Sequence, residues 1–261
     1  MKICVCVKHI PDPNMPMTVS PESRRLIRNK GQSILDPSDE FSVETALRLV
    51  EEHGGETVAV TMGPDAADEA LRRAMAMGID RSILISDEGL AGSDVQGTVR
   101  ALAAALKNED PDLVICATES TDAYTGMVPG ALAEHLGLPM VTFARSVIVE
   151  GSSISAQQDT ELGYRTIQTE LPALLSVTAS IGEPRYPSFK GMMQAKKKTV
   201  DRVDIASLGI DGSSVGEGGA KERVLSISQT HQEKEVRKVV DDGSGDSVGE
   251  IIAYLKSLQV V

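Results

Sequence analysis

The residues best placed to do chemistry lie in a small polar loop, residues 118–126, which carries hydroxyl and carboxylate side chains. The loop follows the unbroken apolar run 113–117, and such a run is typical of a strand buried on both faces of a parallel sheet. Apolar residues then recur at helical spacing over residues 128–138. A helix start has unpaired N–H groups and a partial positive charge, so this arrangement predicts a site for a phosphate or another anion. The alternative is that Ser120 to Asp122 only cap the helix.

The other reactive side chains form neither a hydrolytic nor a metal-binding pattern. No His lies at a metal-ligand spacing from another His or from a Cys. Cys4, Cys6 and Cys116 lie in apolar, strand-like runs without a CxxC pair. We therefore expect these cysteines to be buried as small hydrophobic residues, and we expect no metal site.

Two common phosphate-binding motifs are missing. The chain has no G-x-x-x-x-G-K-[ST] loop and no G-x-G-x-x-G after its first apolar run, which argues against a Walker nucleotide hydrolase and a standard dinucleotide fold. Gly216, Gly218 and Gly219 lie in a polar tail with no strand before them, and they are predicted to form a flexible linker.

The composition argues against a nucleic-acid-binding function. The 261 residues carry a net charge of -12, include no Trp and are only 3% aromatic, whereas nucleic-acid binders need basic surfaces and exposed rings. No apolar run approaches the length of a membrane span, and no secretory signal pattern opens the chain. We expect a cytoplasmic protein with no direct membrane insertion.

Strand-like and helix-like segments alternate from residue 2 to residue 138. Apolar strand patterns cover residues 2–8, 57–62, 83–85 and 113–117. Asp36 and Pro37 form a typical helix start, with an N-cap residue before a proline in the first turn. The alternation predicts an α/β fold: a three-layer, doubly wound, mostly parallel sheet of the adenine-nucleotide-binding, Rossmann-like kind. Ligands of such sheets bind beyond the carboxyl ends of the strands.

A different pattern follows residue 139. Strands over 141–149 and 173–177 are predicted to flank a β-hairpin extension built from 152–155 and 163–169. We expect one domain over residues 1–200, which includes a proline-rich, basic segment at 183–198. Residues 201–261 are predicted to form an extended C-terminal arm that ends in an amphipathic helix around Ile251 to Leu258. The arm has little core of its own, so we expect it to pack on a partner chain.

Several short motifs, each weak alone, occur in order along nearly the whole chain. They are Val7–Asp12, Leu35–Asp39 with Val43–Ala46, Met62–Pro64, Ala76–Asp80, residues 112–139, Leu171–Ala173, Glu183–Tyr186 and Ala195–Lys198. In this combination the chain resembles the β subunit of electron transfer flavoprotein. The resemblance implies an obligate heterodimer with an α subunit that holds most of the FAD, while the β subunit binds a structural AMP. It also implies an electron carrier without catalytic residues, which serves flavin dehydrogenases such as the acyl-CoA dehydrogenases of fatty acid oxidation. The acceptor would be a membrane quinone oxidoreductase.

The resemblance also implies where AMP binds. Backbone N–H groups of Thr125 and Gly126 would hold the phosphate, and the turn 36–39 would frame the adenosine. The full set carried over is Cys6, Asp36, Pro37, Ser38, Asp39, Met62, Asp122, Ala123, Tyr124, Thr125, Gly126, Met127, Val128, Pro129 and Gly130. Met127 stands where many relatives have Gln, and a thioether cannot make the hydrogen bonds of an amide.

By the same resemblance, the proline-rich segment docks on partner dehydrogenases. Phe189 stands at the position of a hydrophobic anchor that is often Leu in relatives. The docking set is Glu183, Pro184, Arg185, Tyr186, Phe189, Met192, Lys196 and Lys197. An apolar tip with a basic collar suits transient contact with acidic partners. The alternative is that the three consecutive lysines only form a solvated face.

Other classes of protein stay open. Some members of the family carry a second FAD in the AMP pocket and bifurcate electrons from NADH, and they tend to have Arg-Gln where this chain has Thr118-Glu119. Because the Glu119 carboxylate would repel a pyrophosphate, the AMP type is favoured. A stand-alone adenine-nucleotide-binding enzyme would need a phosphate loop after the first strand, where this chain has Pro11-Asp12-Pro13. A purely structural interaction protein would leave the pocket empty.

Overall fold

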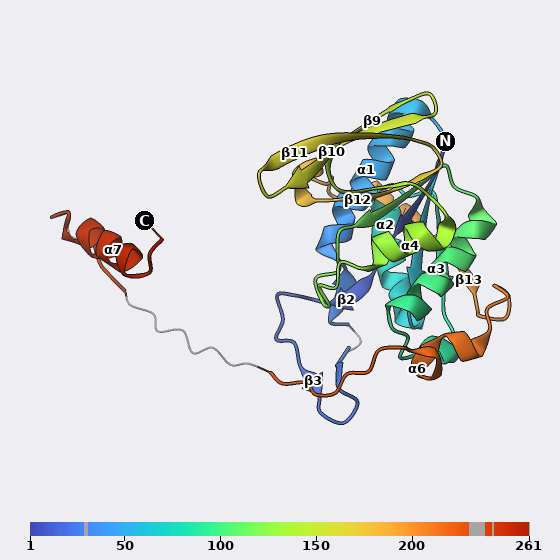
Figure 1. The fold of residues 1–261 in the computed structure, drawn as a ribbon, viewed down its shortest axis with the longest axis horizontal. Coiled ribbons are helices and arrows are strands. Elements are labelled where there is room, and N and C mark those ends of the chain that lie inside the picture. The colour runs from blue at the N-terminus through green and yellow to red at the C-terminus, as the bar shows by residue number, and fades with distance from the viewer. Residues whose placement is uncertain (29–30, 230–237, 242, 261) are drawn as a thin grey trace. The chain divides into compact units, whose positions relative to one another are not determined.

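The apolar runs of the sequence form a nine-stranded sheet in a computed structural model that describes residues 1–28, 31–229, 238–241 and 243–260 (Figure 1). The strand order is β11-β10-β9-β12-β8-β1-β6-β7-β13. The strands are β1 Lys2–Cys6, β6 Glu56–Met62, β7 Arg81–Ile85, β8 Leu113–Ala117, β9 Met140–Glu150, β10 Ser153–Thr160, β11 Gly163–Glu170, β12 Ala173–Val177 and β13 Asp201–Val203. In this spatial order, every adjacent pair of strands between β9 and β13 is parallel. Strand β10 pairs antiparallel with both β9 and β11. The predicted mostly parallel sheet is confirmed.

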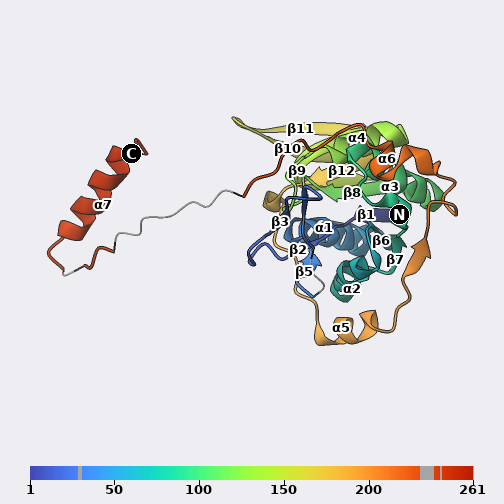
Figure 2. The same ribbon diagram turned by 90° about the horizontal axis from the view of Figure 1, so that it is seen from below.

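Helices cover both faces of this sheet (Figure 2). Helices α1 (Pro37–His53) and α2 (Asp68–Met77) pack on one face, and α3 (Val95–Glu109) and α4 (Val128–Leu136) pack on the other. Strand β1 supplies Ile3 and Val5 to the core on the α1 side and Cys4 and Cys6 to the core on the α3 side. A strand buried on both faces needs no polar alternation. The three-layer, doubly wound architecture predicted from the sequence is therefore confirmed.

All three cysteines lie in the α3-side core. Cys4, Cys6 and Cys116 are buried, and none forms a disulfide. This confirms the expectation that they act as small hydrophobic residues.

Two short antiparallel pairs lie outside the main sheet. Strand β2 (His9–Pro11) pairs with β5 (Ser33–Leu35), and β3 (Val19–Ser20) pairs with β4 (Arg25–Leu26). The β2–β5 pair closes an excursion of the chain that leaves the end of β1 and returns to the start of α1. The excursion therefore lies close to the carboxyl edge of the sheet.

Residues beyond 200 belong partly to the sheet domain. The chain divides into two compact units, Met1–Ile227 and Ser228–Val261, so the expected boundary after residue 200 falls inside the first unit. Strand β13 pairs in parallel with β7. The predicted flexible linker is wrong: residues 216–219 form the one-turn helix α6 (Gly216–Gly219). A Cβ at Gly216 would clash with the Gly89 carbonyl, so this turn is tightly packed.

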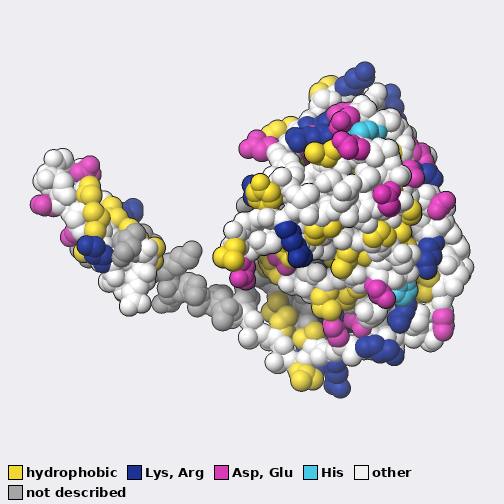
Figure 3. Space-filling model, turned by 45° about the horizontal axis from the view of Figure 1, so that its top comes forward, with side chains coloured by type: hydrophobic (Ala, Val, Ile, Leu, Met, Phe, Trp, Pro, Cys, Tyr) yellow, Lys and Arg dark blue, Asp and Glu magenta, His cyan; other side chains and the backbone are white. Residues whose placement is uncertain are grey.

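The remaining helices are short, except for the last one. They are η1 Asp65–Ala67, η2 Glu88–Leu90, η3 Ala179–Ile181, α5 Phe189–Ala195, η4 Gly212–Ser214 and α7 Asp246–Ser257. Helix α7 confirms the predicted terminal helix and lies in the second unit. Its apolar residues Val248, Ile251 and Ile252 are exposed, and Figure 3 shows hydrophobic side chains along it. On the face of the first unit in the same view, basic and acidic side chains are intermixed.

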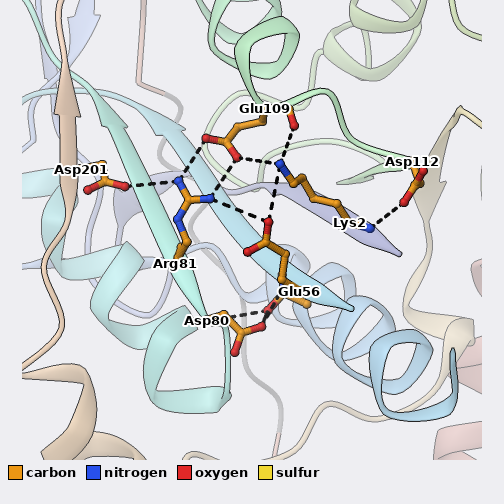
Figure 4. A network of polar contacts seen from close by, with 8 residues as sticks. Lys2, Glu56, Asp80, Arg81, Glu109, Asp112 and Asp201 are labelled. Atoms are coloured by element: carbon orange, nitrogen blue, oxygen red, sulfur yellow. Dashed lines mark hydrogen bonds and ion pairs between the residues drawn. The ribbon is translucent and has the colours of Figure 1, made fainter. Parts of the chain in front are cut away.

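A polar network ties the amino ends of the strands together (Figure 4). The guanidinium of Arg81 pairs with Glu109 at 3.1 Å and with Asp201 at 3.5 Å. The ammonium of Lys2 donates to the Glu109 carbonyl at 2.8 Å. The network lies at the edge opposite the expected ligand site, so its role is to hold β1, β7, α3 and β13 together. Among the helices of the described residues, none is long and apolar enough to cross a membrane.

Candidate functional site

A cleft of ≈ 810 Å³ lies at the carboxyl ends of β1, β6 and β7. Its walls come from the residues after these strands, the excursion between β2 and β5, and the first turns of α2 and α3. The lining includes Lys8, His9, Arg28, Met62, Glu69 and Leu90. The cleft is thus at the edge of the sheet where ligands of doubly wound folds bind.

Lys8, the second residue after β1, connects this cleft to the polar loop. Its ammonium lies 2.5 Å from Asp122 Oδ1 and donates to Ser120 Oγ at 3.1 Å. Its backbone N–H donates to Asp39 Oδ2 at 2.6 Å, and its carbonyl accepts the N–H of Asp36 at 3.0 Å. One residue therefore joins β1, the start of α1 and the loop after β8.

The Asp122 carboxylate is held between two cations. Its side chain is 0% exposed, and Arg28 Nη2 donates to Oδ2 at 2.6 Å. Burial alone would raise the pKa of Asp122, but the charges of Lys8 and Arg28 and their hydrogen bonds lower it below its usual value. Asp122 is therefore ionised at neutral pH, and its charge is locally compensated.

Asp36 fastens the loop to helix α1. It is fully buried, and its Oδ1 caps the helix by accepting the N–H of Ser38 at 2.9 Å. The same carboxylate accepts hydrogen bonds from the Thr121 backbone N–H at 2.8 Å and from the Thr121 hydroxyl at 2.9 Å. The predicted N-cap at Asp36 is confirmed, and it also positions a loop that comes from a different strand.

Helix α4 starts at Val128, where the helical spacing of apolar residues begins in the sequence. Its N-cap is Met127, and no side chain of the described residues caps it by a hydrogen bond. The alternative that Ser120, Thr121 and Asp122 only cap this helix is therefore wrong, because their side chains bond to Lys8, Asp36 and Arg28 instead. The first N–H groups of a helix lack intrahelical partners, so the start of α4 keeps the anion-binding capacity expected from the sequence.

The loop before α4 is exposed. Residues 123–127 are all solvent-accessible, and Tyr124 and Gly126 have positive φ values of 49° and 61°. The Glu119 carboxylate approaches this turn: its Oε2 lies 3.7 Å from the place of a Cβ at Gly126. A negative charge thus lies beside the N–H groups expected to hold a phosphate.

Asp39 differs from Asp122 in its electrostatics. Burial and the neighbouring Asp36 charge raise the pKa of Asp39 well above its usual value, although the Lys8 N–H bond opposes this. A raised folded-state pKa contributes stability that is present at low pH and is lost as pH rises through that pKa.

We expect Asp39→Asn to match the wild type in unfolding free energy at acid pH and to exceed it at pH 8. The amide oxygen can still accept the Lys8 N–H, and each unit of pKa elevation corresponds to about 1.4 kcal/mol. Urea unfolding at pH 3 and pH 8 checks this, because pH 3 lies below 3.8, the ordinary pKa of the aspartate. A variant that loses stability equally at both pH values would contradict it.

His9 is a functional candidate that the motif search did not include. Its side chain is 8% exposed, and Nε2 lies 3.8 Å from Glu69 Oε2 without a hydrogen bond to the described residues. Burial lowers the pKa of His9. The neutral ring therefore keeps a nitrogen buried behind the cleft wall without a hydrogen bond to the described residues.

The predicted nucleotide residues fall into three groups. Met62 lines the cleft. Cys6, Asp36 and Asp39 are buried beneath the edge of the sheet, and residues 122–130 lie at the adjoining end of β8. Lys8 brings the last two groups together. Lys8 and Arg28 were missed as site residues, and the signal for Lys8 was a single cation directly after an apolar strand.

The predicted docking residues divide by exposure. Tyr186 is 91% and Phe189 77% exposed, and Met192 and both Lys196 and Lys197 are also exposed. Arg185 is half-buried because its guanidinium lies against α1. The segment therefore presents an apolar tip, whereas its arginine faces inward.

These features define a class: a doubly wound α/β protein with a cleft and an uncapped helix start at the carboxyl edge of its sheet. A family model described as "Electron transfer flavoprotein domain" matches residues 24–208. The chain is 38% identical over 265 residues to the electron transfer flavoprotein subunit beta of Mycobacterium tuberculosis, covering 99% of each chain. It is 32% identical over 271 residues to the subunit of the same name from Megasphaera elsdenii, covering 100% of each. It is also 29% identical over 263 residues to caffeyl-CoA reductase-Etf complex subunit CarD of Acetobacterium woodii, again covering 100% of each. The chain belongs to the electron transfer flavoprotein family.

Proposed function

We propose that this chain is the β subunit of a heterodimeric electron transfer flavoprotein and acts as an electron carrier without catalytic residues of its own. It binds a structural AMP and borders the FAD held mainly by an α subunit. It docks on flavin dehydrogenases such as acyl-CoA dehydrogenases, and the electrons pass to a membrane quinone oxidoreductase. The observation that carries this proposal is the similarity, over the whole chain, to proteins named electron transfer flavoprotein subunit beta.

The carboxyl edge of the sheet offers the two parts that AMP needs. The uncapped start of α4 supplies N–H groups and a positive dipole end for one phosphate. The neighbouring cleft supplies an apolar wall, with Met62 and Leu90, for the adenosine. The Glu119 carboxylate near Gly126 would oppose a pyrophosphate more strongly than a monophosphate, because the pyrophosphate brings more negative charge. The site therefore favours a mononucleotide.

We expect Gly130→Glu to remove the bound AMP while the fold is kept. Gly130 lies in the first turn of α4, and an added Cβ would meet only Met140 Cε, at 4.0 Å. An acidic residue in a first helical turn is otherwise favourable. Two like charges about 4 Å apart repel by about 4 kcal/mol at an effective dielectric constant of 20, so AMP occupancy should fall more than tenfold. Chromatography of nucleotides released from the acid-treated heterodimer measures this.

The matched control is Gly130→Gln, which has nearly the same shape without the charge. It should retain AMP. Equal loss in both variants would mean that the side chain acts by bulk, and unchanged AMP in Gly130→Glu would place the phosphate elsewhere.

The second candidate function is the type with two FAD molecules. Its support is the relative named as part of a caffeyl-CoA reductase-Etf complex. The same chromatography separates the candidates: one AMP and one FAD per heterodimer support the proposal, and two FAD support the alternative. A lone chain that hydrolyses ATP would contradict both.

Exposed apolar residues in two places support the proposed protein partners. The tip formed by Tyr186, Phe189 and Met192 would contact the dehydrogenase. The exposed apolar residues of α7, at the end of the C-terminal arm, would pack on the α subunit. Isolated helices of this length are marginal in water, so a partner surface is needed to stabilise such an apolar face.

A further inference from the structure

We propose that Arg185 is a positioning residue: it clasps the docking segment, residues 183–198, onto helix α1 and so fixes the exposed tip before a partner arrives. The inference rests on the proposed docking function. It assigns to Arg185 a role within the chain and no contact with the dehydrogenase.

The clasp begins at Glu44, in the middle of α1. Arg185 Nε donates to Glu44 Oε2 at 2.7 Å, and Nη2 donates to Oε1 at 3.2 Å. The backbone N–H of Arg185 donates to the same carboxylate at 3.1 Å. The Glu44 side chain is only 5% exposed. A buried carboxylate thus holds both the side chain and the backbone of Arg185.

Glu51, two turns further along α1, completes the clasp. Its Oε1 lies 2.5 Å from Arg185 Nη1, and its Oε2 accepts from Nη2 at 3.0 Å. All three guanidinium nitrogens are therefore engaged by α1. A planar guanidinium bound bidentately by two carboxylates is strongly oriented, so Arg185 is not a free cation for a partner.

The hydrogen bonds from Arg185 leave both glutamates ionised. Burial alone would raise the pKa of Glu44, but the bonds from Arg185 and Arg48 lower it below its usual value. The Arg185 bond likewise lowers the pKa of Glu51. The clasp therefore stays closed at neutral pH.

Further contacts hold the segment on both sides of its tip. Arg48 donates to the Glu183 carbonyl at 3.1 Å. Arg72 donates to the Ala195 carbonyl at 2.9 Å, and Lys198 donates to the Ile79 carbonyl at 2.7 Å. In Figure 2, α5 lies beside α2 at the lower edge of the first unit.

The tip lies between these two sets of anchors. Tyr186, Phe189, Met192 and Met193 are exposed although the backbone on either side is fixed. A segment that is already ordered loses less conformational entropy on binding, and this improves affinity without a new contact. Loss of the clasp should therefore weaken docking and leave the electron transfer step itself unchanged.

The test compares two neighbouring charge-removing variants of α1, Glu51→Gln and Glu52→Gln, in the heterodimer. Only the first touches Arg185, because Glu52 is 74% exposed and lies near His53. The readouts are hydrogen exchange at the Arg185 amide and reduction of the carrier by a medium-chain acyl-CoA dehydrogenase with octanoyl-CoA. We expect faster exchange in Glu51→Gln and a KM for the carrier raised roughly three- to tenfold at unchanged kcat, the effect of a few side chains ordered on binding. Glu52→Gln should match the wild type. Arg185→Lys, which keeps the charge without the fork, should raise the KM as well.

Each remaining outcome decides something different. Unchanged exchange and unchanged KM in Glu51→Gln overturn the clasp, and so does a lower kcat at constant KM. If Phe189→Ala raises the KM and Glu51→Gln does not, the clasp fails while the docking function stands. If Phe189→Ala has no effect, or if this dehydrogenase does not reduce the wild type, the proposed docking partner fails, and hydrogen exchange alone then decides the clasp.

Discussion

Replacing Asp36 with Ala is expected to lower the unfolding free energy by about 3 kcal/mol, the sum of a lost helix cap and a buried N–H left without its acceptor. The carboxylate is fully buried, caps α1 through Ser38 and accepts both hydrogen bonds from Thr121. The variant removes all three bonds at once. Urea unfolding of the nucleotide-free chain measures the loss, so that nucleotide release does not contribute to it.

Asp94 provides the matched comparison. It also caps a helix, α3, by accepting the N–H of Gly97 at 2.9 Å, and its Oδ2 accepts the N–H groups of Lys221 at 2.6 Å and Glu222 at 3.3 Å, but it is only partly buried. Asp94→Ala should cost less, about 1 to 2 kcal/mol, because water can replace the bonds of a partly exposed carboxylate. Equal losses in the two variants would show that the burial of the Asp36 bonds adds nothing to their contribution to stability.

Phe189→Ala is expected to weaken docking on the dehydrogenase by about 2 kcal/mol, a roughly thirtyfold rise in KM for the carrier, as for an anchor residue at an interface. The ring is 77% exposed and lies at the start of α5, so its removal leaves no cavity in the core. The melting temperature and AMP content should not change. Steady-state reduction at varied carrier concentration gives the KM.

Leu162→Ala is the control for this second prediction, because Leu162 is a fully exposed apolar side chain in the turn between β10 and β11. The dehydrogenase should reduce the Leu162→Ala carrier at the wild-type rate. Loss of AMP in Phe189→Ala, or the same rise in KM in both variants, would argue against an anchor at Phe189.

Local signals predicted most of the elements. The Asp36-Pro37 start of α1, the glycine after its last turn and the doubly buried strand β8 all depend on near neighbours in the sequence. Strand β13 was missed because it is three residues long and mostly exposed, so it has no apolar run. Only its pairing with β7 defines it.

The side-chain pairs at the site could not be predicted in the same way. Lys8 and Asp122 are 114 residues apart, and Arg185 and Glu44 are 141 apart. Such pairs depend on strand order and on the register of a helix against the sheet, which the periodicity of apolar residues does not encode. The family resemblance indicates which regions bind a nucleotide or a partner protein. Only the fold shows which charged side chains pair with one another.

The burial of the three cysteines has a practical consequence for studying the docking segment. Burial raises the pKa of Cys4, and a hydrogen bond with Cys116 together with burial raises that of Cys6. Thiol reagents react with the thiolate and need access to it, so the native chain should react only slowly with maleimides. A cysteine introduced at exposed Lys197 would then be the one site of rapid labelling on this subunit. A fluorophore or spin label placed there could report dehydrogenase encounters in real time, in a chain that keeps all of its native cysteines.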